Sequence, residues 1–419
     1  MMTEPESSEL TDESQFSIFG ALSLFIVSLV LTGLFHVLRT QNQAWWFEVG
    51  FILSAATAIS ILIAEACDPF ADAAQWVGVK LRLPSSVRGA TLDAIASSMP
   101  ELFTGIFFVM VALMGDKDQA ERLADSAHGY GSTIATCAGS SIYNLVLIPA
   151  VCAIAVSYSR RSKPHVEVAR DVINRDGAWV IFTQIGLLIF LFQPKLDWWM
   201  GVVALVAYLC YVFHLYIATS RFRAQLDEGE IETEEPEDSA SVLFGFFDVG
   251  LTGLTSTIIL VAATLVAAGA CYLLVGLTNQ SAESLGVSPF FVAVILTAAV
   301  SSIPDTFMSL GSARRGDDSG AVSNVFGSNI FDICIGMSIP LLVSCYLNDW
   351  QPLDLVSLDD RTHSGVVGLR VFLFVLTAIT MSVMWYKRRI TRSTGWIFVA
   401  LYGSFFAYAI LGAIGWIQV

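Results

Sequence analysis

Two short stretches of the chain place a carboxylate beside a proline and several hydroxyls, inside long apolar runs. SSMPELFTG at 97–105 contains Glu101, and SSIPDTFMS at 301–309 contains Asp305. A carboxylate inside a membrane-spanning helix is costly and marks a functional site by default. A proline there breaks the helical hydrogen bonding and frees carbonyl oxygens, which is tolerable in lipid only where something buried uses them. The two stretches therefore predict a buried polar site.

A second pair of matching stretches follows, GSSIYNL at 139–145 and GSNIFDI at 327–333. In each copy two polar residues lie four positions apart, so that both face the same side of a helix. A lone polar residue in a membrane helix is usually a kink or a packing contact. Here three carboxylates recur in register with the repeat, which favours one convergent site. The matched residues are Ser140 with Ser328 and Asn144 with Asp332.

The convergent residues supply carboxylates, hydroxyls, an amide and carbonyls, and they include no Cys, His or Lys. Hard cations such as calcium take six to eight oxygen ligands of these kinds. The set therefore favours calcium or sodium over zinc, copper or an anion. The seven cysteines are scattered through apolar segments without CxxC spacing, which indicates buried hydrophobic residues rather than a metal cluster or a disulfide framework.

The composition indicates that lipid is the solvent for most of the chain, since 55% of its 419 residues are hydrophobic and 14% are charged. The net charge of −15 is concentrated in two stretches, 1–15 and 227–238, that contain no Lys or Arg. We expect both stretches to be solvated and disordered. The remainder is nearly neutral, so the charge gives no indication of nucleic-acid binding.

The apolar runs predict an all-α polytopic membrane protein, with two inverted repeats of five transmembrane helices and one extra N-terminal helix. The eleven expected spans are 16–38, 45–67, 86–114, 131–158, 177–193, 197–219, 247–278, 288–312, 319–347, 367–386 and 394–417. The expected organisation is an acidic tail at 1–15, the extra helix and its connection at 16–44, a first half at 45–219 with its repeat at about 86–158, an acidic loop at 220–246, and a second half at 247–419 with its repeat at about 288–347.

The two proline-containing spans are the third and the eighth, so they cross the membrane in opposite directions. Matching halves of opposite orientation are typical of secondary transporters, which bind substrate and coupling ions near the midplane on interrupted helices. Most Lys and Arg residues fall in loops on the side of the N-terminus, which predicts that the N-terminus and the 220–243 loop are cytoplasmic. The first span lacks the positive start of a signal peptide, so we expect a retained helix.

These stretches resemble the two alpha-repeats of the sodium/calcium exchanger superfamily, also called calcium/cation antiporters. The resemblance begins upstream, at CDPFADAAQWVGVKLRLPSSVRGATLDAIASSMPEL, and covers about 60–158 and 288–340. SIPDT, AVSNVFGSNIFDI and GSTIATCAGSSIYN are most similar to the potassium-dependent sodium/calcium exchangers. The resemblance implies two inverted halves of five helices and exchange of calcium for sodium by alternating access, with potassium as a candidate co-transported ion.

Carried over by position, the resemblance implies that Glu101 and Asp305 are the central calcium ligands and alternately serve sodium. It also implies supporting ligands in the same four stretches: Ser97, Ser98, Ser140, Asn144, Ser301, Ser302, Ser328 and Asp332, with carbonyls from Ala94 and Ala298. The sequence departs from the family where Ala96 and Val300 replace the usual glycine before each hydroxyl pair. Asp93 replaces an apolar residue, and we expect it to face the aqueous mouth near Arg88.

Three alternatives stay open at this point. The same fold could couple calcium to protons, or carry magnesium or exchange sodium for lithium. A channel is disfavoured by the two mirrored halves. An intramembrane protease would need two acids with one perturbed pKa, or a serine with a His or Lys base. Of the five histidines only His36 and His214 fall within the expected spans, near their ends and far from the repeats. We therefore expect a transporter of inorganic cations in the lipid bilayer, in the plasma membrane, with no enzymatic activity, no resident cofactor and no nucleic-acid partner; a monomer suffices for transport.

Overall fold

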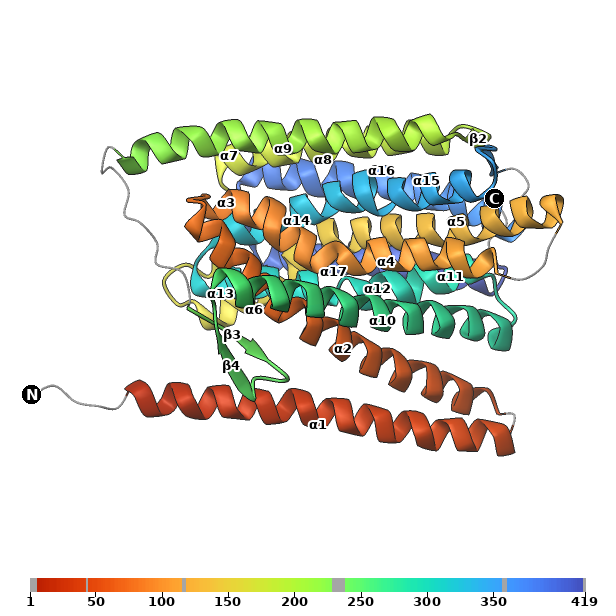
Figure 1. Ribbon diagram of the computed structural model, residues 1–419, viewed down its shortest axis with the longest axis horizontal. Coiled ribbons are helices and arrows are strands. Elements are labelled where there is room, and N and C mark those ends of the chain that lie inside the picture. Colours follow the sequence, from red (N-terminus) through yellow and green to blue (C-terminus); the bar gives the residue numbers. More distant parts are fainter. Residues whose placement is uncertain (1–5, 43, 115–117, 228–237, 356–359, 417–419) are drawn as a thin grey trace, which may run out of the picture.

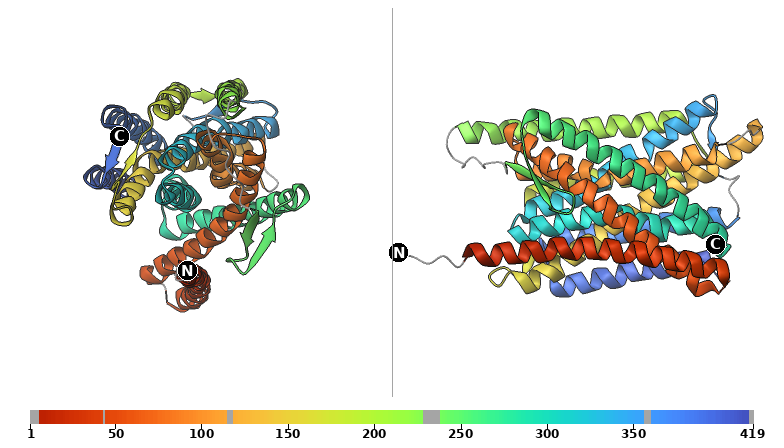
Figure 2. Two further views of the ribbon diagram at one scale, coloured as in Figure 1. Left: turned by 90° about the vertical axis from the view of Figure 1, so that its left-hand side faces the viewer. Right: turned by 60° about the horizontal axis from the view of Figure 1, so that its bottom comes forward.

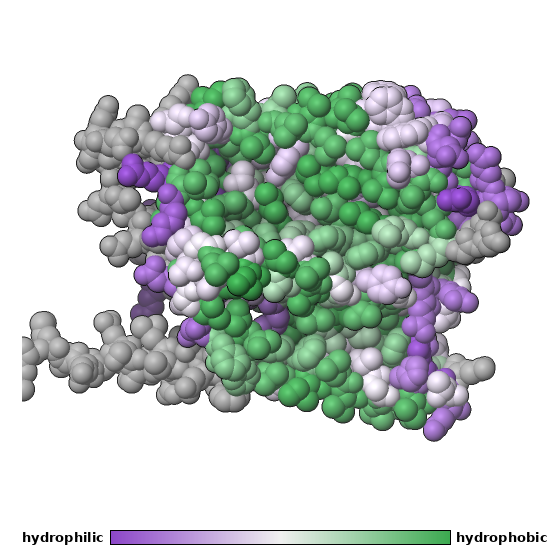
Figure 3. Space-filling model, viewed as in Figure 1, coloured by the Kyte–Doolittle hydropathy of each residue, from purple (hydrophilic) through white to green (hydrophobic). Residues whose placement is uncertain are grey.

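A computed structural model describes the chain except residues 1–5, 43, 115–117, 228–237, 356–359 and 417–419. Long helices lie side by side and form one bundle (Figure 1). Among the described residues, ten helical stretches are long and apolar enough to cross a membrane. A broad hydrophobic band covers the middle of the molecule, and hydrophilic residues gather toward its two ends (Figure 3). The chain is thus a polytopic all-α membrane protein, as predicted.

The first part of the chain forms α1 (Glu6–Gln41), α2 (Trp45–Lys80), α3 (Ser85–Arg88), α4 (Ala94–Ala112), α5 (Gln119–Ile142), α6 (Ile148–Ser159), α7 (Arg170–Val172), α8 (Ala178–Leu191) and α9 (Trp198–Asp227). The second part forms α10 (Gly253–Leu285), α11 (Pro289–Val292), α12 (Ala298–Ser301), α13 (Ile303–Arg315), α14 (Asp318–Phe331), α15 (Ser338–Leu347), α16 (Asp360–Lys387) and α17 (Arg392–Ala413). Five π-helical turns continue these helices: η1 (Gly89–Asp93), η2 (Tyr143–Leu147), η3 (Ile173–Gly177), η4 (Ala293–Thr297) and η5 (Asp332–Gly336).

The two repeat segments run in opposite directions. In Figure 1 the chain passes from left to right between α3 and α4, and from right to left between α11 and α13. Two short sheets also join the halves: β1 (His165–Glu167) pairs with β6 (Arg389–Thr391), and β2 (Lys195–Leu196) pairs with β5 (Leu353–Asp354), both antiparallel. Each sheet takes one strand from each half, so the halves are connected by backbone hydrogen bonds outside the apolar band.

The first helix lies at the edge of the bundle (Figure 2). α1 packs against α2 and leaves apolar side chains such as Leu24 and Val30 exposed, as expected where lipid is the solvent. It begins at Glu6, so the predicted disorder of 1–15 does not hold from that residue onward. The other segment predicted to be disordered, 227–238, falls almost entirely outside the described residues.

Several expected boundaries move because of specific caps and polar residues. The Asp118 side chain accepts a hydrogen bond from the Glu121 N–H, and α5 therefore starts well before the expected 131. Thr252 and Thr255 form a reciprocal capping box that starts α10 after 250, while β3 (Ser239–Val242) and β4 (Phe247–Gly250) form a hairpin within the expected loop and at the expected start of the helix.

The predicted span 177–193 is the one expected span that is not among the ten apolar stretches of the described residues. It corresponds to α8, which continues α7 and η3 without a break. Together they make 22 residues (170–191), which cover about 33 Å and are long enough for a hydrocarbon core of about 30 Å. With α7 and η3 the helical stretch reaches back to Arg170, and the charged residues of this extension explain why its hydropathy is low.

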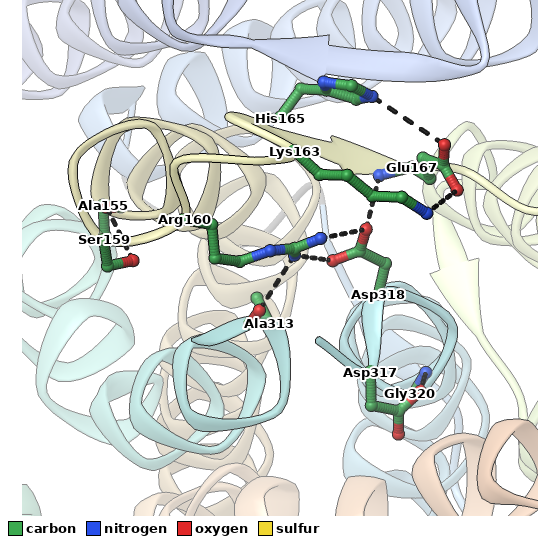
Figure 4. A network of polar contacts seen from close by, with 10 residues as sticks. All are labelled: Ala155, Ser159, Arg160, Lys163, His165, Glu167, Ala313, Asp317, Asp318 and Gly320. Atoms are coloured by element: carbon green, nitrogen blue, oxygen red, sulfur yellow. Dashed lines mark hydrogen bonds and ion pairs between the residues drawn. The ribbon is translucent and has the colours of Figure 1, made fainter. Parts of the chain in front are cut away.

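A charged network ties the loop after α6 to the turn between α13 and α14 (Figure 4). The Arg160 guanidinium lies 2.5 Å from Asp318 Oδ1 and 3.0 Å from the Ala313 carbonyl oxygen. The Glu167 backbone N–H donates to Asp318 Oδ2 at 2.9 Å. The Arg160 and Asp318 side chains are 14% and 10% exposed, so this ion pair is largely shielded from water.

We predict that Asp318→Asn lowers the free energy of unfolding by about 2 kcal/mol, because it leaves the Arg160 charge largely buried without a counter-ion. Thermal unfolding of the detergent-solubilised protein measures the effect. Glu167→Gln is the matched control in the same loop, since the Lys163–Glu167 pair is more than half exposed and contributes little. Equal unfolding temperatures for the two variants would contradict a stabilising role of the Arg160–Asp318 ion pair.

Candidate cation-binding site

The four polar stretches meet in the middle of the bundle. Glu101 lies on α4, Ser140 near the end of α5, Asp305 in the first turn of α13, and Ser328 on α14. All four side chains are fully buried, as are those of Asn144 and Asp332. The sequence prediction that these segments converge is met by the geometry.

Ser140 is the residue that connects both copies of the repeat. Its Oγ lies 3.0 Å from Glu101 Oε1 and 2.8 Å from Asp332 Oδ2. The Ser302 Oγ lies 2.8 Å from Ser140 Oγ and 3.2 Å from Glu101 Oε1. A hydroxyl has one proton to donate, so these two serines cannot satisfy every oxygen around them at once.

Asp305 receives its hydrogen bonds from the opposite side of the cluster. The Ser328 hydroxyl donates to Asp305 Oδ1 at 2.5 Å, and the Asn144 amide donates to Asp305 Oδ2 at 3.2 Å. The same amide nitrogen lies 3.4 Å from Asp332 Oδ2. One neutral amide therefore bridges two carboxylates. Asp305 is held by groups from both repeats, whereas the side chains that contact Asp332 come from the first repeat.

Oxygen acceptors outnumber proton donors in this cluster. Four buried oxygens have no hydrogen-bond partner of regular geometry: Ser98 Oγ, Glu101 Oε2, Asn144 Oδ1 and Asp332 Oδ1. The Ser98 hydroxyl nevertheless lies beside Asp332, and the Ser301 hydroxyl lies beside Glu101. Buried oxygens without donors are costly unless a positive charge satisfies them. Among the described residues no three His, Cys, Asp or Glu side chains are placed to hold a metal ion by themselves. Hydroxyl and amide oxygens would have to complete any cation site here.

The remaining predicted residues lie in the same segments, with different environments. Ser97 Oγ is 2.8 Å from the Asp93 carbonyl oxygen and 3.4 Å from Ser328 Oγ. Ser301 Oγ donates to the Ala298 carbonyl at 3.4 Å, and that carbonyl also accepts from the Ser302 N–H. The carbonyl of Ala298 is therefore already occupied by hydrogen bonds. Ala94, whose carbonyl oxygen is the other predicted backbone ligand, is fully buried on α4.

The prolines do not break both helices as expected. α4 continues through Pro100, whereas the second copy ends α12 at Ser301 and restarts as α13 at Ile303, with Pro304 in the first turn. Pro304 is tolerated because the second residue of a helix needs no backbone donor. A membrane helix continues through a proline where other groups satisfy the freed backbone atoms.

Sequence reasoning missed the π-helical turns that accompany each polar stretch. η1 precedes α4 and η4 precedes α12, while η2 contains Asn144 and η5 begins at Asp332. π-turns are rare and concentrate at functional sites. They occur at matching positions in both copies, so each repeat encodes one local geometry. No residue pattern in the sequence announces them.

A polar cavity of about 410 Å³ opens beside the cluster, at the end of the bundle where the β3–β4 hairpin lies. It is lined by Asp93, which accepts a hydrogen bond from Gln75 Nε2 at 3.2 Å, as well as by Glu65, Asp68 and Asp72. These three acids of α2 share one helical face, a spacing visible in the sequence that we did not use. Because the Asp93 carbonyl oxygen accepts from Ser97, the cavity wall adjoins the cluster. Asp93 thus faces a mouth, as predicted.

Two glycines allow the segments to approach so closely. A Cβ at Gly327 of α14 would lie 2.5 Å from the Ala90 carbonyl oxygen in η1, and one at Gly139 of α5 would lie 2.9 Å from Ala298 Cβ. Both precede a candidate ligand by one residue, Ser328 and Ser140. The glycines of the repeat therefore set the depth at which these hydroxyls lie.

The sequence model of the family described as "Sodium/calcium exchanger protein" matches residues 49–217 and 255–411, which is more than half of the chain. The chain belongs to the sodium/calcium exchanger family. The matched ranges contain every residue of the candidate site, and they leave out α1 and the segment around the acidic loop. The resemblance stated from the motifs is confirmed.

Curated relatives match this family member over a shorter region. Sodium/potassium/calcium exchanger 2 of Gallus gallus is 33% identical over 141 residues, which is 33% of this chain and 21% of that protein. Sodium/potassium/calcium exchanger 1 of Homo sapiens is 34% identical over 140 residues, or 33% of this chain and 12% of that protein. The matches thus span about a fifth or less of the length of these relatives.

Solved structures share the fold at low sequence identity. The sodium-calcium exchanger NCX_Mj superimposes with a TM-score of 0.52 at 21% identity, over 83% of this chain and 95% of that one. Native YfkE gives 0.60 at 16% identity over 94% and 99%, and the H+/Ca2+ exchanger CAX gives 0.60 at 14% identity over 96% and 93%. These structural similarities establish the exchanger fold. They do not identify the ion that is exchanged for calcium.

We predict that Gly327→Ala lowers the free energy of unfolding by about 1–3 kcal/mol, because its Cβ would overlap the Ala90 backbone. Thermal unfolding in detergent measures the loss. Gly269→Ala is the matched control in α10, where a Cβ meets nothing within 4 Å. Alanine there removes glycine's helix penalty of about 0.5–1 kcal/mol, so stability should hold or rise. A harmless Gly327→Ala would mean that η1 and α14 are not held in close contact.

Proposed function

We propose that this family member is a secondary active antiporter that exchanges calcium for sodium across a membrane by alternating access. The observation that carries the proposal is the buried cluster of three carboxylates from two oppositely directed repeats, in which one carboxylate oxygen of Glu101, one of Asp332 and the amide oxygen of Asn144 have no hydrogen-bond partner of regular geometry. Such a cluster suits a dehydrated hard cation. Its location at the crossing of two mirrored segments suits a site reached from either side in turn.

In this proposal Glu101 and Asp305 are the central ligands for calcium and, alternately, for sodium. Asp332 and Asn144 complete the site with hydroxyls from both repeats, which form the predicted set of Ser97, Ser98, Ser140, Ser301, Ser302 and Ser328. The negative charge of the carboxylates offsets the cost of removing water from the ion. The acidic cavity lined by Asp93 would raise the local concentration of cations at one mouth.

We also propose an orientation of the chain in the membrane. The distribution of Lys and Arg supports a cytoplasmic N-terminus and a cytoplasmic 220–243 loop, and we place the protein in the plasma membrane. The acidic cavity lies beside the β3–β4 hairpin that follows this loop, so its mouth would open to the cytoplasm.

We predict that Glu101→Gln and Asp305→Asn each reduce sodium-driven calcium flux by about a hundredfold or more, because loss of a charge from a buried charged contact costs about 3–5 kcal/mol. The measurement is calcium uptake into sealed vesicles under imposed gradients of sodium, potassium or protons, one at a time. Glu283→Gln, an exposed acid on α10, is the matched control and should transport as wild type.

Two outcomes would contradict the proposal in different ways. Robust transport by either carboxylate variant at saturating calcium would place the site elsewhere in the bundle. Wild-type uptake driven by a proton gradient, and not by sodium, would mean that the calcium site is correct but that protons, rather than sodium, are exchanged for calcium.

The charge of Asp332 supports a finer proposal, that potassium accompanies calcium. Glu101, Asp305 and Asp332 bring up to three negative charges into one buried cluster, and calcium offsets two of them. A co-bound monovalent cation would restore the balance, and three sodium ions would do so in the alternate state. The matching residue of the first repeat is the neutral Asn144, so Asp332 is an acid that occurs in only one of the two repeats. The alternative is a protonated Asp332 when calcium binds.

We predict that sodium-driven calcium flux requires potassium in the wild type and becomes independent of it in Asp332→Asn, since the variant removes the charge that potassium would offset. Flux is measured with potassium present or replaced by an impermeant cation on both sides of the vesicle membrane. Wild-type flux that ignores potassium would refute co-transport and favour the protonated state of Asp332.

A further inference from the structure

Gln184 contacts both ligand-bearing helices, α5 and α14, next to the candidate ligands. It lies on α8 and is 3% exposed. Its Nε2 donates to Ser141 Oγ and to Asn329 Oδ1, both at 2.8 Å. Ser141 directly follows Ser140 on α5, and Asn329 directly follows Ser328 on α14. One side chain therefore bonds to the immediate neighbours of two candidate ligands, one from each repeat.

The side chains of Ser141, Gln184 and Asn329 form one connected set of hydrogen bonds between α5, α8 and α14. Ser141 Oγ donates to Asn329 Oδ1 at 2.5 Å, and Asn329 Nδ2 returns a bond to the Ser141 carbonyl oxygen at 2.8 Å. Gln184 Nε2 lies at the same distance from Ser141 Oγ and Asn329 Oδ1, which are themselves in contact, so one of its N–H groups is shared between these two acceptors. Reversing the Gln184 amide would set its oxygen against Asn329 Oδ1, which fixes the orientation as described.

The far side of the Gln184 amide has a different environment. Its Oε1 has no hydrogen-bond partner, and the residue lines a groove of about 640 Å³ between α8 and α16. The amide is thus held through its nitrogen alone. This asymmetry indicates that the side chain is placed for its contacts with α5 and α14 rather than for packing within α8.

We propose that Gln184 is a positioning residue that fixes the spacing of α5 and α14 and thereby sets the affinity and size selectivity of the cation site. The inference rests on the proposed function and deepens it, since it adds a selectivity-determining residue outside the ligand set. Residues that hold metal ligands in place typically change metal affinity about 10–100-fold when they are mutated. Selectivity between hard cations depends on cavity size and on the rigidity of the ligands.

The test is Gln184→Met, which keeps the length of the side chain and removes both N–H donors. We expect the half-saturating calcium concentration to rise about tenfold while the maximal flux at saturating calcium stays near wild type. The ratio of strontium to calcium uptake should rise, because a looser spacing admits the larger ion. Thr183→Val is the matched control: Thr183 is a neighbouring buried residue whose hydroxyl bonds only to backbone carbonyls of its own helix, and this variant should change neither quantity.

A second variant keeps the inference testable if Gln184→Met does not fold. Ser141→Ala removes a smaller member of the same set and should shift affinity and the strontium ratio in the same direction. The double variant should be little worse than the stronger single variant, since both break one shared set of bonds. Additive effects, or an unchanged half-saturating concentration with an unchanged ion ratio, would overturn the positioning role.

The outcomes separate this inference from the proposed function. If wild type moves calcium and Glu101→Gln does not, yet Gln184→Met keeps wild-type affinity and ion ratio, the proposed function stands and the positioning role is wrong. If Glu101→Gln transports normally, the cation site itself is misplaced. If Thr183→Val matches Gln184→Met in every measurement, the effect belongs to the packing of α8, and Gln184 has no special role.

Discussion

The cost of burying carboxylates in a membrane protein is the constraint on which the rest of the structure depends. Glu101, Asp305 and Asp332 are each fully removed from solvent, and an isolated buried charge would cost far more than a folded protein can offset. Hydroxyls and one amide reduce that cost, but they supply fewer protons than the oxygens around them can accept. A site of this kind is stable enough to fold and still unsatisfied enough to take up a cation.

The helices are arranged so that this cluster can exist. The three carboxylates lie on α4, on α13 and in η5, and the side chains that bond to them come from α5, η2, α14 and the residue between α12 and α13. Glycine at 327 and at 139 lets these segments meet at backbone distance, closer than most side chains allow. The outer helices α1 and α10 contribute lipid-facing surface, and the two strand pairs join the halves where the chain leaves the apolar band.

The sequence predicted which polar side chains come together better than it predicted the bounds of the helices that hold them. Carboxylates in apolar runs are rare, so each one indicates a functional position. The sequence repeat also showed that Ser140 and Ser328 occupy matching positions. Helix starts depended on single caps such as Asp118, whose effect is local and has no signature in hydropathy. The polar start of the helix that contains α8 was missed because hydropathy shows where an apolar run lies and not how far the helix continues beyond it. The π-turns were missed because their hydrogen bonds shift without any change in residue type.

Symmetry of the scaffold and asymmetry of the donors are two separate properties of this protein. Backbone features recur in both repeats, including the π-turns and the glycines that precede Ser140 and Ser328. Glu101 is matched by another acid, Asp305, but other polar side chains do not recur, since Asn144 is matched by Asp332 and Ser141 by Asn329. A repeated backbone lets one site be reached from either side of the membrane. If the polar side chains were also identical, the two repeats would present the same charge and the same oxygen ligands to the ion. The acid at Asp332 and the bond from Gln184 to both repeats break that equivalence without disturbing the backbone. Charge and spacing can therefore be tuned independently of the movement that the inverted halves support.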